Sequence, residues 1–504
     1  MIHCDISLPP AARAYIDALP DGDWFLFDMS PLDITGVPAW KAAYFPHYAT
    51  SPGCTMQQGT GYGEIPAQAM IAAVAECYEE VSARRGFARR LVVHGSYAAL
   101  AAERGRDGVA DPYLLGLPAG STINHDTPLA WVEAHRWFGR EPVLVPVDIA
   151  ALDNATLPAG YRPFTTLITN GLGAGPSLEW AAAHGLFECL QRDGNGLAFR
   201  ALDRGIELSF EAVLPPALES AMDRVANAGI DLLPKFATDE FGIANVFVVG
   251  AECHPDRLAC PIALTGAGEG ADLDRNTALR KAVLEYAHAR ARKAFAFGSL
   301  ETIRAVMPAG YWQRVEPRVR RAARATEPRQ IEAFREWLAL DGVQLRDLLA
   351  DTVFAVRGKR AFETLPISDI DTPEQKGAEV ARRLIAAGFD PLILDFSPPG
   401  AAMHAARVIV PGLEAETLSY HRIGERNAAK LIAMDSDLIR WGPPSETCRP
   451  IVLTAAARER LGGVPLLDVA AVDRLVGRLY PLYREPGAHE MLYHGRDLLT
   501  ESAV

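Results

Sequence analysis

The segment Asn170-Gly-Leu-Gly-Ala-Gly-Pro-Ser177 leads directly into a long, largely apolar stretch that runs from Leu178 to about Arg200. Glycine allows the backbone to approach neighbouring atoms closely, and Ser177 is a suitable N-cap for a helix that begins at Leu178. A strand-like region, from about Pro142 to Ile168, precedes the glycines. The order of strand, glycine loop and Ala-rich helix indicates an α/β fold in which sheets pack against long helices.

The same order occurs twice more. Gly59-Thr-Gly-Tyr-Gly63 precedes a helix expected over 66–85, with Pro66 in its first turn. Gly266-Ala-Gly-Glu-Gly270 precedes a helix expected over 274–296. No fixed period relates the three segments, so the sequence does not indicate a repeat. Additional strands are expected at Trp24–Phe27, Phe247–Gly250, Ile262–Leu264, Phe389–Phe396 and Ala406–Pro411, and residues 310–360 have a charged, helical pattern.

The organisation of the chain indicates one intertwined domain. No linker rich in Pro, Gly and Ser divides it, and we expect a core over residues 1–435. Residues 436–504 are expected to form a C-terminal tail of short helices and Pro-rich turns. At 504 residues the chain is long enough to bury a large core.

Composition excludes several classes of protein. The net charge of -13 argues against general nucleic-acid binding, which needs a basic face. We find no signal peptide and no apolar run long enough for a membrane helix, so we expect no membrane partner. The seven cysteines form no C-x-x-C pair, which disfavours structural zinc and is typical of reduced thiols in a cytoplasmic protein.

Polar side chains recur at helical spacing on the three expected helices. They are Glu76, Glu79 and Glu80 on the first; His184, Glu188, Gln191 and Arg192 on the second; and Lys281, Glu285, His288 and Arg290 on the third. Residues three and four apart share one helix face. Mg²⁺ prefers carboxylate and phosphate oxygens, and arginine and lysine can balance phosphate charge. The three stripes together therefore favour a site for ATP and Mg²⁺.

An ordinary structural interpretation stays open at this point. A polar stripe on a single helix is most often a solvated face. None of the glycine segments matches the phosphate loop G-x-x-x-x-G-K-[ST] or a dinucleotide fingerprint. The chain has no G-x-S-x-G, H-E-x-x-H or kinase motif set. The residues alone therefore leave the catalytic residues unknown.

The ordered motifs resemble those of the YcaO family over about residues 25–430. Ala73-x-x-Glu76-x-x-Glu79-Glu80 is similar to the family's S-x-x-E-x-x-E-R motif. Asn170–Gly175 with Glu188-Cys-Leu-Gln-Arg-Asp193 resembles its N-G-x-A-x-G and E-x-x-E-R-D segments. The remaining likenesses are Pro31–Pro38, Glu285-x-x-His288-x-Arg290, Val410–Glu414 and Arg422–Arg426.

The resemblance implies a YcaO-like ATP-binding fold and a role for each stripe. Glu76, Glu79, Glu188 and Gln191 would hold Mg²⁺. Arg192 and Arg290 would contact phosphate, while His184, Glu285 and His288 would line the ATP pocket. The implied activity is ATP-dependent modification of backbone amides in a ribosomally made peptide, giving a thioamide or an azoline. The implied partners are a peptide or protein substrate and a separate TfuA-like or leader-peptide-binding protein, and a homodimer is compatible with the resemblance.

Four positions depart from the family pattern. Glu80 replaces arginine, Gln191 replaces glutamate, His288 replaces glutamine, and Tyr62 replaces the lysine of a Gly-Lys-Gly loop. The end Leu498-Leu-Thr-Glu-Ser-Ala-Val504 also lacks the Pro-x-Pro-x-Pro pattern of azoline-forming members. Because the family pattern begins near residue 25, we expect no fused leader-binding module before it. We expect thioamide formation, with an azoline cyclodehydratase and a catalytically weak peptide-binding scaffold as the alternatives.

Overall fold

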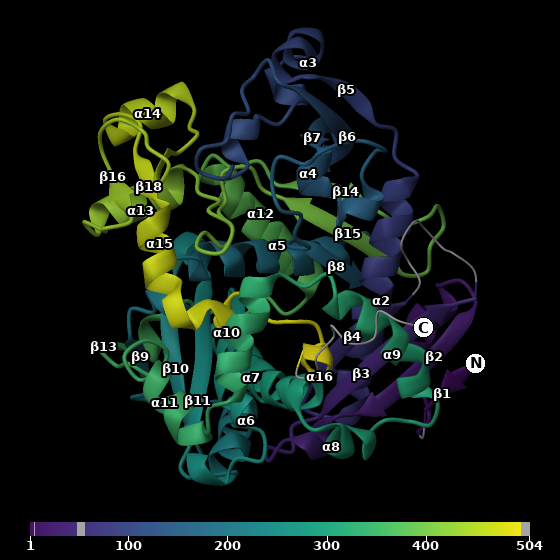
Figure 1. Cartoon of the computed structure of the whole chain (residues 1–504). Helices are drawn as coiled ribbons and strands as arrows, with labels where there is room; N and C mark the ends of the chain where they lie inside the picture. The colour runs from purple at the N-terminus through teal and green to yellow at the C-terminus, as the bar shows by residue number, and fades with distance from the viewer. Residues whose placement is uncertain (5, 48–55, 495–504) are drawn as a thin grey trace, which may run out of the picture.

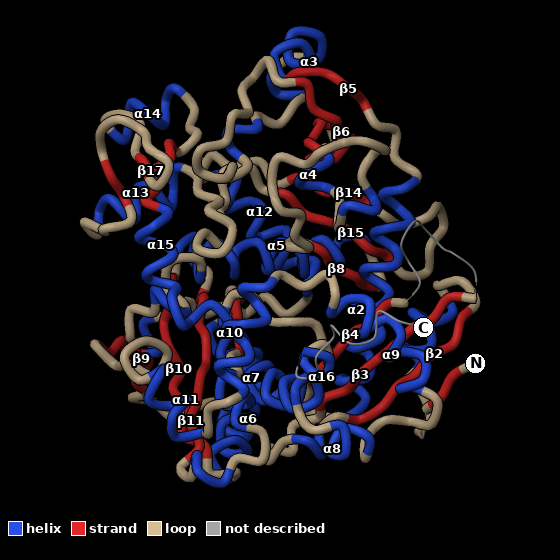
Figure 2. Tube along the Cα trace, in the orientation of Figure 1, coloured by secondary structure: helices blue, strands red, loops and turns tan. Residues whose placement is uncertain are grey.

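The computed structural model describes residues 1–4, 6–47 and 56–494. Three sheets lie around a group of central helices, as Figures 1 and 2 show. The N-terminal sheet contains, in spatial order, β1 (Ile2–His3), β2 (Gly22–Asp28), β3 (Ala39–Pro46) and β4 (Gln57–Tyr62). The mixed α/β architecture confirms the predicted fold class.

The other two large sheets combine strands that lie far apart in the sequence. One has the order β5 (Val93–Ser96), β6 (Pro128–Arg136), β14 (Leu392–Asp395), β15 (His404–Ile409) and β8 (Leu172–Gly175), with β7 (Pro142–Pro146) paired to β6. The next has the order β12 (Gly268–Asp272), β11 (Ala244–Glu252), β10 (Ile230–Thr238), β9 (Ile206–Ser209) and β13 (Gly358–Ala361). In the first of these sheets, β14 and β15 pair with β6 and β8, so strands from the first and last parts of the core lie side by side.

The three glycine segments, which we expected to be loops, instead contribute the edge strands β4, β8 and β12. Each packs on the helix that follows it: α2 (Pro66–Ala88), α5 (Leu178–Asn195) and α7 (Arg275–Phe297). A Cβ atom on Gly61, Gly173 or Gly268 would lie 2.3, 2.1 or 1.9 Å from a helix carbonyl oxygen. The glycines are therefore needed for contact between strand and helix backbones rather than for loop flexibility.

A glutamate from each helix binds the adjacent edge strand. The backbone N–H of Thr60 donates to Glu76, that of Gly171 to Glu188 at 2.9 Å, and that of Glu269 to Glu285 at 3.1 Å. An edge strand has unpaired N–H groups that need an acceptor. We call these three contacts the glutamate latches, and they fix one carboxylate of each stripe at a strand edge.

The three units also contact one another in a closed cycle. Besides its own strand, α2 contacts β8, α5 contacts β12, and α7 contacts β4. The three helices therefore converge through these strand contacts. The sequence did not indicate a repeat because the segments that connect the units differ in length and structure.

Several predicted boundaries were wrong. Ile262–Leu264 belongs to a 3-10 helix, Pro261–Thr265, which Pro261 begins, rather than to a strand. The region 142–168 contains only the strand β7 before short helical turns. The second helix ends at Asn195 instead of near residue 200, and the chain then turns at Arg200, whose φ is 62°. Ser177 caps α5 as predicted, accepting from the Trp180 N–H at 3.1 Å.

The remaining helices cover the sheets or build the last third of the chain. They include α1 (Pro10–Asp17), α6 (Pro216–Asn227), α8 (Leu300–Arg304), α9 (Tyr311–Ala323), α10 (Pro328–Leu338), α11 (Gly342–Leu349), α12 (Pro373–Ala386), α13 (Glu425–Ala433), α14 (Ala455–Leu461) and α15 (Val469–Val476). The helical pattern predicted for 310–360 is confirmed by α9, α10 and α11.

The C-terminal segment forms a small sheet and then returns to the core. The strands β16 (Ile439–Arg440), β18 (Leu466–Asp468) and β17 (Cys448–Pro450) pair side by side. Beyond them, Glu485 pairs with Arg292 and Lys293, and the His489 N–H donates to the Ala296 carbonyl at 2.8 Å. Figure 1 shows this yellow segment running to α16 (Met491–His494), beside β3 and α9. The predicted features of residues 495–504 lie outside the described residues.

Within the described ranges, none of the helices has the length and apolar character needed to cross a membrane.

Candidate functional site

Carboxylates from α2 and α5 come together beside β4 and the start of β8. The Glu79 side chain is half-buried, and the protein around its carboxyl group raises its pKa well above the ordinary value. The negative charges of Glu188, Glu76 and Glu80 raise it further. Glu79 forms no hydrogen bond or ion pair with another described residue. A carboxyl group in this setting lacks a positive partner, and a bound cation would supply one.

The neighbouring carboxylates are held by the glutamate latches. Glu76 reaches solvent, yet the protein crowded around it raises its pKa despite the Thr60 N–H bond. Glu188 lies 3.6 Å from Arg192 as well as accepting from Gly171. In the described part of the chain, no three acidic, histidine or cysteine side chains are already arranged to hold a metal. Carboxylate oxygens are ligands that Mg²⁺ prefers, and these side chains would have to move closer together to bind one ion.

A second polar group is centred on Arg192. Its guanidinium contacts Glu269 at 3.1 Å, and the Asn195 amide donates to the same carboxylate at 2.6 Å. Burial would raise the pKa of Glu269, but Arg192, Arg200 and hydrogen bonds from Asn195 and Gln191 lower it below the ordinary value. The Gln191 side chain therefore lies at Glu269. Together, Glu188, Arg192 and Glu269 connect the carboxylates of α2 to β12.

Glu285 completes this group from α7. Its burial, together with the nearby charge of Glu269, raises its pKa to about 7. The Glu269 N–H opposes this rise by donating to Glu285. Glu285 is therefore a carboxyl group that can exchange a proton near neutral pH, beside the Arg192–Glu269 pair.

The raised pKa of Glu285 predicts a pH-dependent effect of Glu285→Gln on stability. Below pH 4, Glu285 is protonated in both the folded and the unfolded chain, so the variant and the native protein should unfold alike. As pH rises towards 7, the unfolded chain releases this proton first, and the native protein loses stability relative to the variant. At pH 8 the variant should be more stable by about 1 to 3 kcal/mol.

Thermal unfolding at pH 5, 6, 7 and 8, without nucleotide or Mg²⁺, measures this difference. Glutamine can still accept the Glu269 N–H, so the latch is retained. Glu301→Gln, in an exposed position of α8, is the matched control and should show no trend with pH. A constant difference between Glu285→Gln and the native protein across this range would contradict the prediction.

The other predicted ATP-binding side chains occupy different environments. His184 reaches solvent, although surrounding protein and the charge of Lys281 lower its pKa. His288 is buried against the Tyr62 ring, with centroids 5.4 Å apart, and burial lowers its pKa to about 3. His288 therefore lies under β4 in its neutral form.

The prediction that Arg290 contacts phosphate was wrong. Its side chain is 1% exposed and is held by Asp33 at 3.0 Å and by Glu252. Helical spacing explains the error, because Lys281, Glu285, His288 and Arg292 share one face of α7, whereas Arg290 points away from it. Arg292 is 40% exposed, and its charge affects the pKa of both Glu76 and Glu285.

Two functional candidates were missed in the sequence. Arg292 continues the i, i+4, i+7 stripe by four residues, so extension of the periodicity could have found it. Glu269 is the one acidic residue in Gly266-Ala-Gly-Glu-Gly270, and a carboxylate enclosed by glycines is an unusual feature for a simple loop. Its role became visible only with its Arg192 contact.

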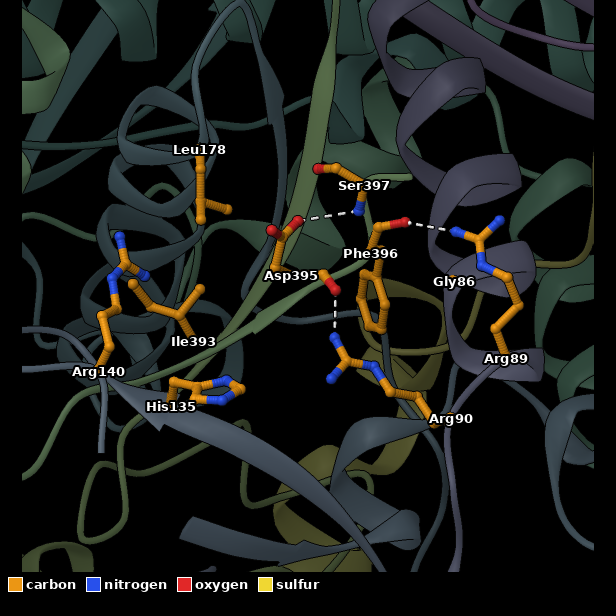
Figure 3. A pocket seen from close by; sticks show the side chains of 10 residues that line it. All are labelled: Gly86, Arg89, Arg90, His135, Arg140, Leu178, Ile393, Asp395, Phe396 and Ser397. Carbon is orange, nitrogen blue, oxygen red and sulfur yellow. Dashed lines mark hydrogen bonds between the residues drawn. The ribbon is translucent and has the colours of Figure 1, made fainter. Parts of the chain in front are cut away.

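Two cavities lie near these helices. One, of about 390 Å³, opens beside Arg192, Asn195 and Glu269 and has aromatic walls that include Tyr420 and Tyr483. The other, of about 620 Å³, is shown in Figure 3 and contains none of the predicted site residues. There Arg89 donates to the Phe396 carbonyl at 3.1 Å and Arg90 to the Asp395 carbonyl. The first cavity therefore provides the space for a ligand beside the acidic group.

A family model described as YcaO cyclodehydratase, binding ATP and Mg²⁺, matches residues 60–414. The chain belongs to the YcaO family. The match covers the helices α2, α5 and α7 and the acidic residues of all three latches. ATP and Mg²⁺ are accordingly the cofactors of this YcaO protein, as predicted.

Individual relatives agree with this assignment. An uncharacterized protein of Methanothermobacter thermautotrophicus is 25% identical over 405 residues, which are 79% of this chain and 91% of the relative. The structure of YcaO from Methanopyrus kandleri, bound with AMPPCP and Mg²⁺, has a TM-score of 0.53 and 19% identity, covering 82% of this chain and 91% of that one. A heterocyclase in complex with substrate and cofactor has a TM-score of 0.51 and 16% identity. The latter alignment covers 75% of this YcaO chain but only 48% of the heterocyclase.

Proposed function

We propose that this YcaO protein uses Mg·ATP to activate a backbone amide of a peptide, and that the product is a thioamide. The observation that carries the proposal is the uncompensated carboxyl group of Glu79 beside Glu76, Glu80 and Glu188, next to the Arg192 guanidinium. A polyphosphate with its Mg²⁺ needs both kinds of partner, because carboxylates hold the ion and guanidinium groups bind phosphate oxygens.

The proposed roles follow the placement of the side chains. Glu76, Glu79 and Glu188 would hold Mg²⁺, and the Gln191 amide oxygen would add a neutral ligand. Arg192 and Arg292 would contact phosphate. His184, Glu285 and His288 would line the remainder of the nucleotide site, which adjoins the 390 Å³ cavity.

The proposed reaction conserves atoms and charge. A sulfide nucleophile adds to the amide carbon, and the resulting oxyanion attacks the γ-phosphorus of ATP, so that ADP leaves. The carbon–oxygen bond then breaks, phosphate departs, and loss of a proton gives the thioamide. A guanidinium group such as that of Arg192 can stabilise the charge that develops on the transferred phosphoryl group. Glu285 is suited to exchange the proton because its pKa is near 7.

Azoline formation is the second candidate, because the matching family model is described as a cyclodehydratase. In that reaction a Cys, Ser or Thr side chain of the peptide is the nucleophile, and the peptide loses one water. Mass spectrometry of the modified peptide separates the two products: exchange of oxygen for sulfur supports the thioamide, whereas loss of water supports the azoline. An unmodified peptide, despite ATP hydrolysis and binding, would contradict both.

We also propose that a separate protein delivers the sulfur or the peptide, such as a TfuA-like or leader-peptide-binding partner. Co-purification with candidate partners, and light scattering for a homodimer, test these two assemblies.

Gln191→Glu should lower the Mg²⁺ concentration that gives half-maximal ATP turnover. An amide oxygen contributes no formal charge to the metal site, whereas a carboxylate does. The expected decrease is about tenfold, and phosphate release across a Mg²⁺ series, with peptide and partner present, measures it. If the protein is a peptide-binding scaffold without catalysis, neither the native chain nor the variant should release phosphate. That result, with folded protein and bound peptide, would contradict the proposed catalytic activity.

A further inference from the structure

Lys41 is a buried lysine without a bonded partner. It lies in the apolar strand β3, and its side chain is 7% exposed. It forms no hydrogen bond and no ion pair within 4.0 Å of another described residue. Lys235, the comparable buried lysine of β10, donates to Asp203 at 2.6 Å and to the Val353 carbonyl at 2.7 Å. The Lys41 nitrogen is not among the fully enclosed, unbonded polar atoms of the described residues, so it keeps an opening to solvent. A largely buried lysine without a partner calls for an explanation that Lys235 does not.

The surroundings of Lys41 connect it to the acidic site. Thr60, the donor of the first glutamate latch, is its direct partner across β3 and β4. Burial lowers the pKa of Lys41 to about 8, and the charges of Glu76 and Glu80 oppose this change. Arg292, on the neighbouring face of α7, adds a second positive charge. The ammonium group therefore lies near the edge strand at which the carboxylates of α2 gather.

Two buried histidines share this environment. Burial lowers the pKa of both His288 and His489, and the charge of Lys41 lowers it further. The Nε2 atom of His288 and both ring nitrogens of His489 are buried without a hydrogen-bond partner among the described residues. Lys41, His288 and His489, which we call the nitrogen niche, thus combine a cation with three unsatisfied nitrogen atoms. A neutral imidazole has one N–H donor, so this group can offer the Lys41 ammonium group and at most one N–H from each ring to an anion that enters from the adjacent site.

The nearby glutamates are already bonded elsewhere. Glu76 accepts from the Thr60 backbone, while Glu80 accepts from Gln57 and pairs with Arg84 at 3.4 Å. They attract Lys41 without contacting it, so an additional anion is needed to satisfy the ammonium group. We propose that Lys41 binds the phosphate groups of ATP, on the β3 side of the carboxylates that would hold Mg²⁺. This inference rests on the proposed function.

Two measurements distinguish phosphate binding by Lys41 from a purely structural role. If the partner of Lys41 is a phosphate of bound ATP, Lys41→Met removes an unpaired charge from the nucleotide-free protein. The midpoint of thermal unfolding without nucleotide should then be unchanged or higher. The same substitution should weaken binding of Mg·ATP by about tenfold or more, measured by calorimetry. If Lys41 mainly balances Glu76 and Glu80, Lys41→Met should lower the midpoint and leave the affinity for ATP unchanged.

The experiment compares Lys41→Met, Lys41→Gln and Lys359→Met with the native chain. Lys359 is an exposed residue of β13, so its variant changes the net charge equally without altering the site. Lys41→Gln provides a polar replacement if methionine prevents folding. Weaker binding of Mg·ATP by the Lys41 variants alone, with an undiminished midpoint, supports the inference.

If a folded Lys41 variant binds Mg·ATP with the same affinity as the native protein, the inference is overturned and the proposed function stays intact. Absence of ATP binding by the native protein would instead overturn the proposed function, and the inference with it. A titration with inorganic phosphate, in the same variants, shows whether Lys41 recognises phosphate without the nucleoside.

Discussion

Glu188→Ala is expected to abolish Mg²⁺-dependent binding of ATP. Glu188 connects both polar groups of the site, because its charge raises the pKa of Glu79 and its carboxylate lies 3.6 Å from Arg192. Loss of one metal-binding carboxylate leaves the phosphate charge less neutralised. We expect the dissociation constant of Mg·ATP to rise by about a hundredfold or more, and calorimetry with and without Mg²⁺ measures it.

A second substitution separates the metal from the latch. Glu188 also accepts from the Gly171 N–H, so alanine leaves that edge-strand donor unpaired. Glu188→Gln keeps an oxygen at this place but removes the charge. Its thermal stability should match that of the native protein, whereas its affinity for Mg·ATP should fall as in the alanine variant. Equal ATP affinity in Glu188→Gln, or native binding that is independent of Mg²⁺, would contradict the metal assignment.

Gly268→Ala is expected to disrupt the fold itself. A Cβ atom at this position would lie 1.9 Å from the Ala282 carbonyl oxygen and 2.4 Å from the Tyr286 nitrogen. Both atoms belong to the backbone of α7, so no side-chain movement can relieve the clash, and β12 must separate from the helix. We expect a loss of about 4 kcal/mol or more, or no folded protein.

Thermal unfolding and the yield of folded protein measure this effect. Gly358→Ala is the matched control, since it also lies in an edge strand and its Cβ atom would meet only the end of the Ile206 side chain, at 3.2 Å. It should change stability by less than about 1 kcal/mol. Similar midpoints for the two variants would show that β12 does not depend on direct backbone contact with α7.

The local sequence pattern predicted the three long helices correctly, but it did not predict the strands formed by the glycine segments. The predicted helices over 66–85, 178–200 and 274–296 correspond to α2, α5 and α7, because long Ala-rich stretches with caps such as Ser177 favour helix before any tertiary contact forms. The glycine segments were predicted as loops since glycine is a poor strand former on its own. Their pairing as β4, β8 and β12 depends on helix backbones that only the folded chain supplies.

Helical spacing and motif order are local properties, so the residues alone were enough to indicate the family, ATP with Mg²⁺, and the acidic stripes that carry Glu76, Glu79 and Glu188. The cations that face this acidic site became known only from the folded chain. Arg290 was expected there but pairs with Asp33 and Glu252, whereas Arg292 and Lys41 come near it from α7 and β3. Burial and charge pairing join residues that are distant in the chain, such as Asp33 and Arg290, and a local pattern does not record such contacts.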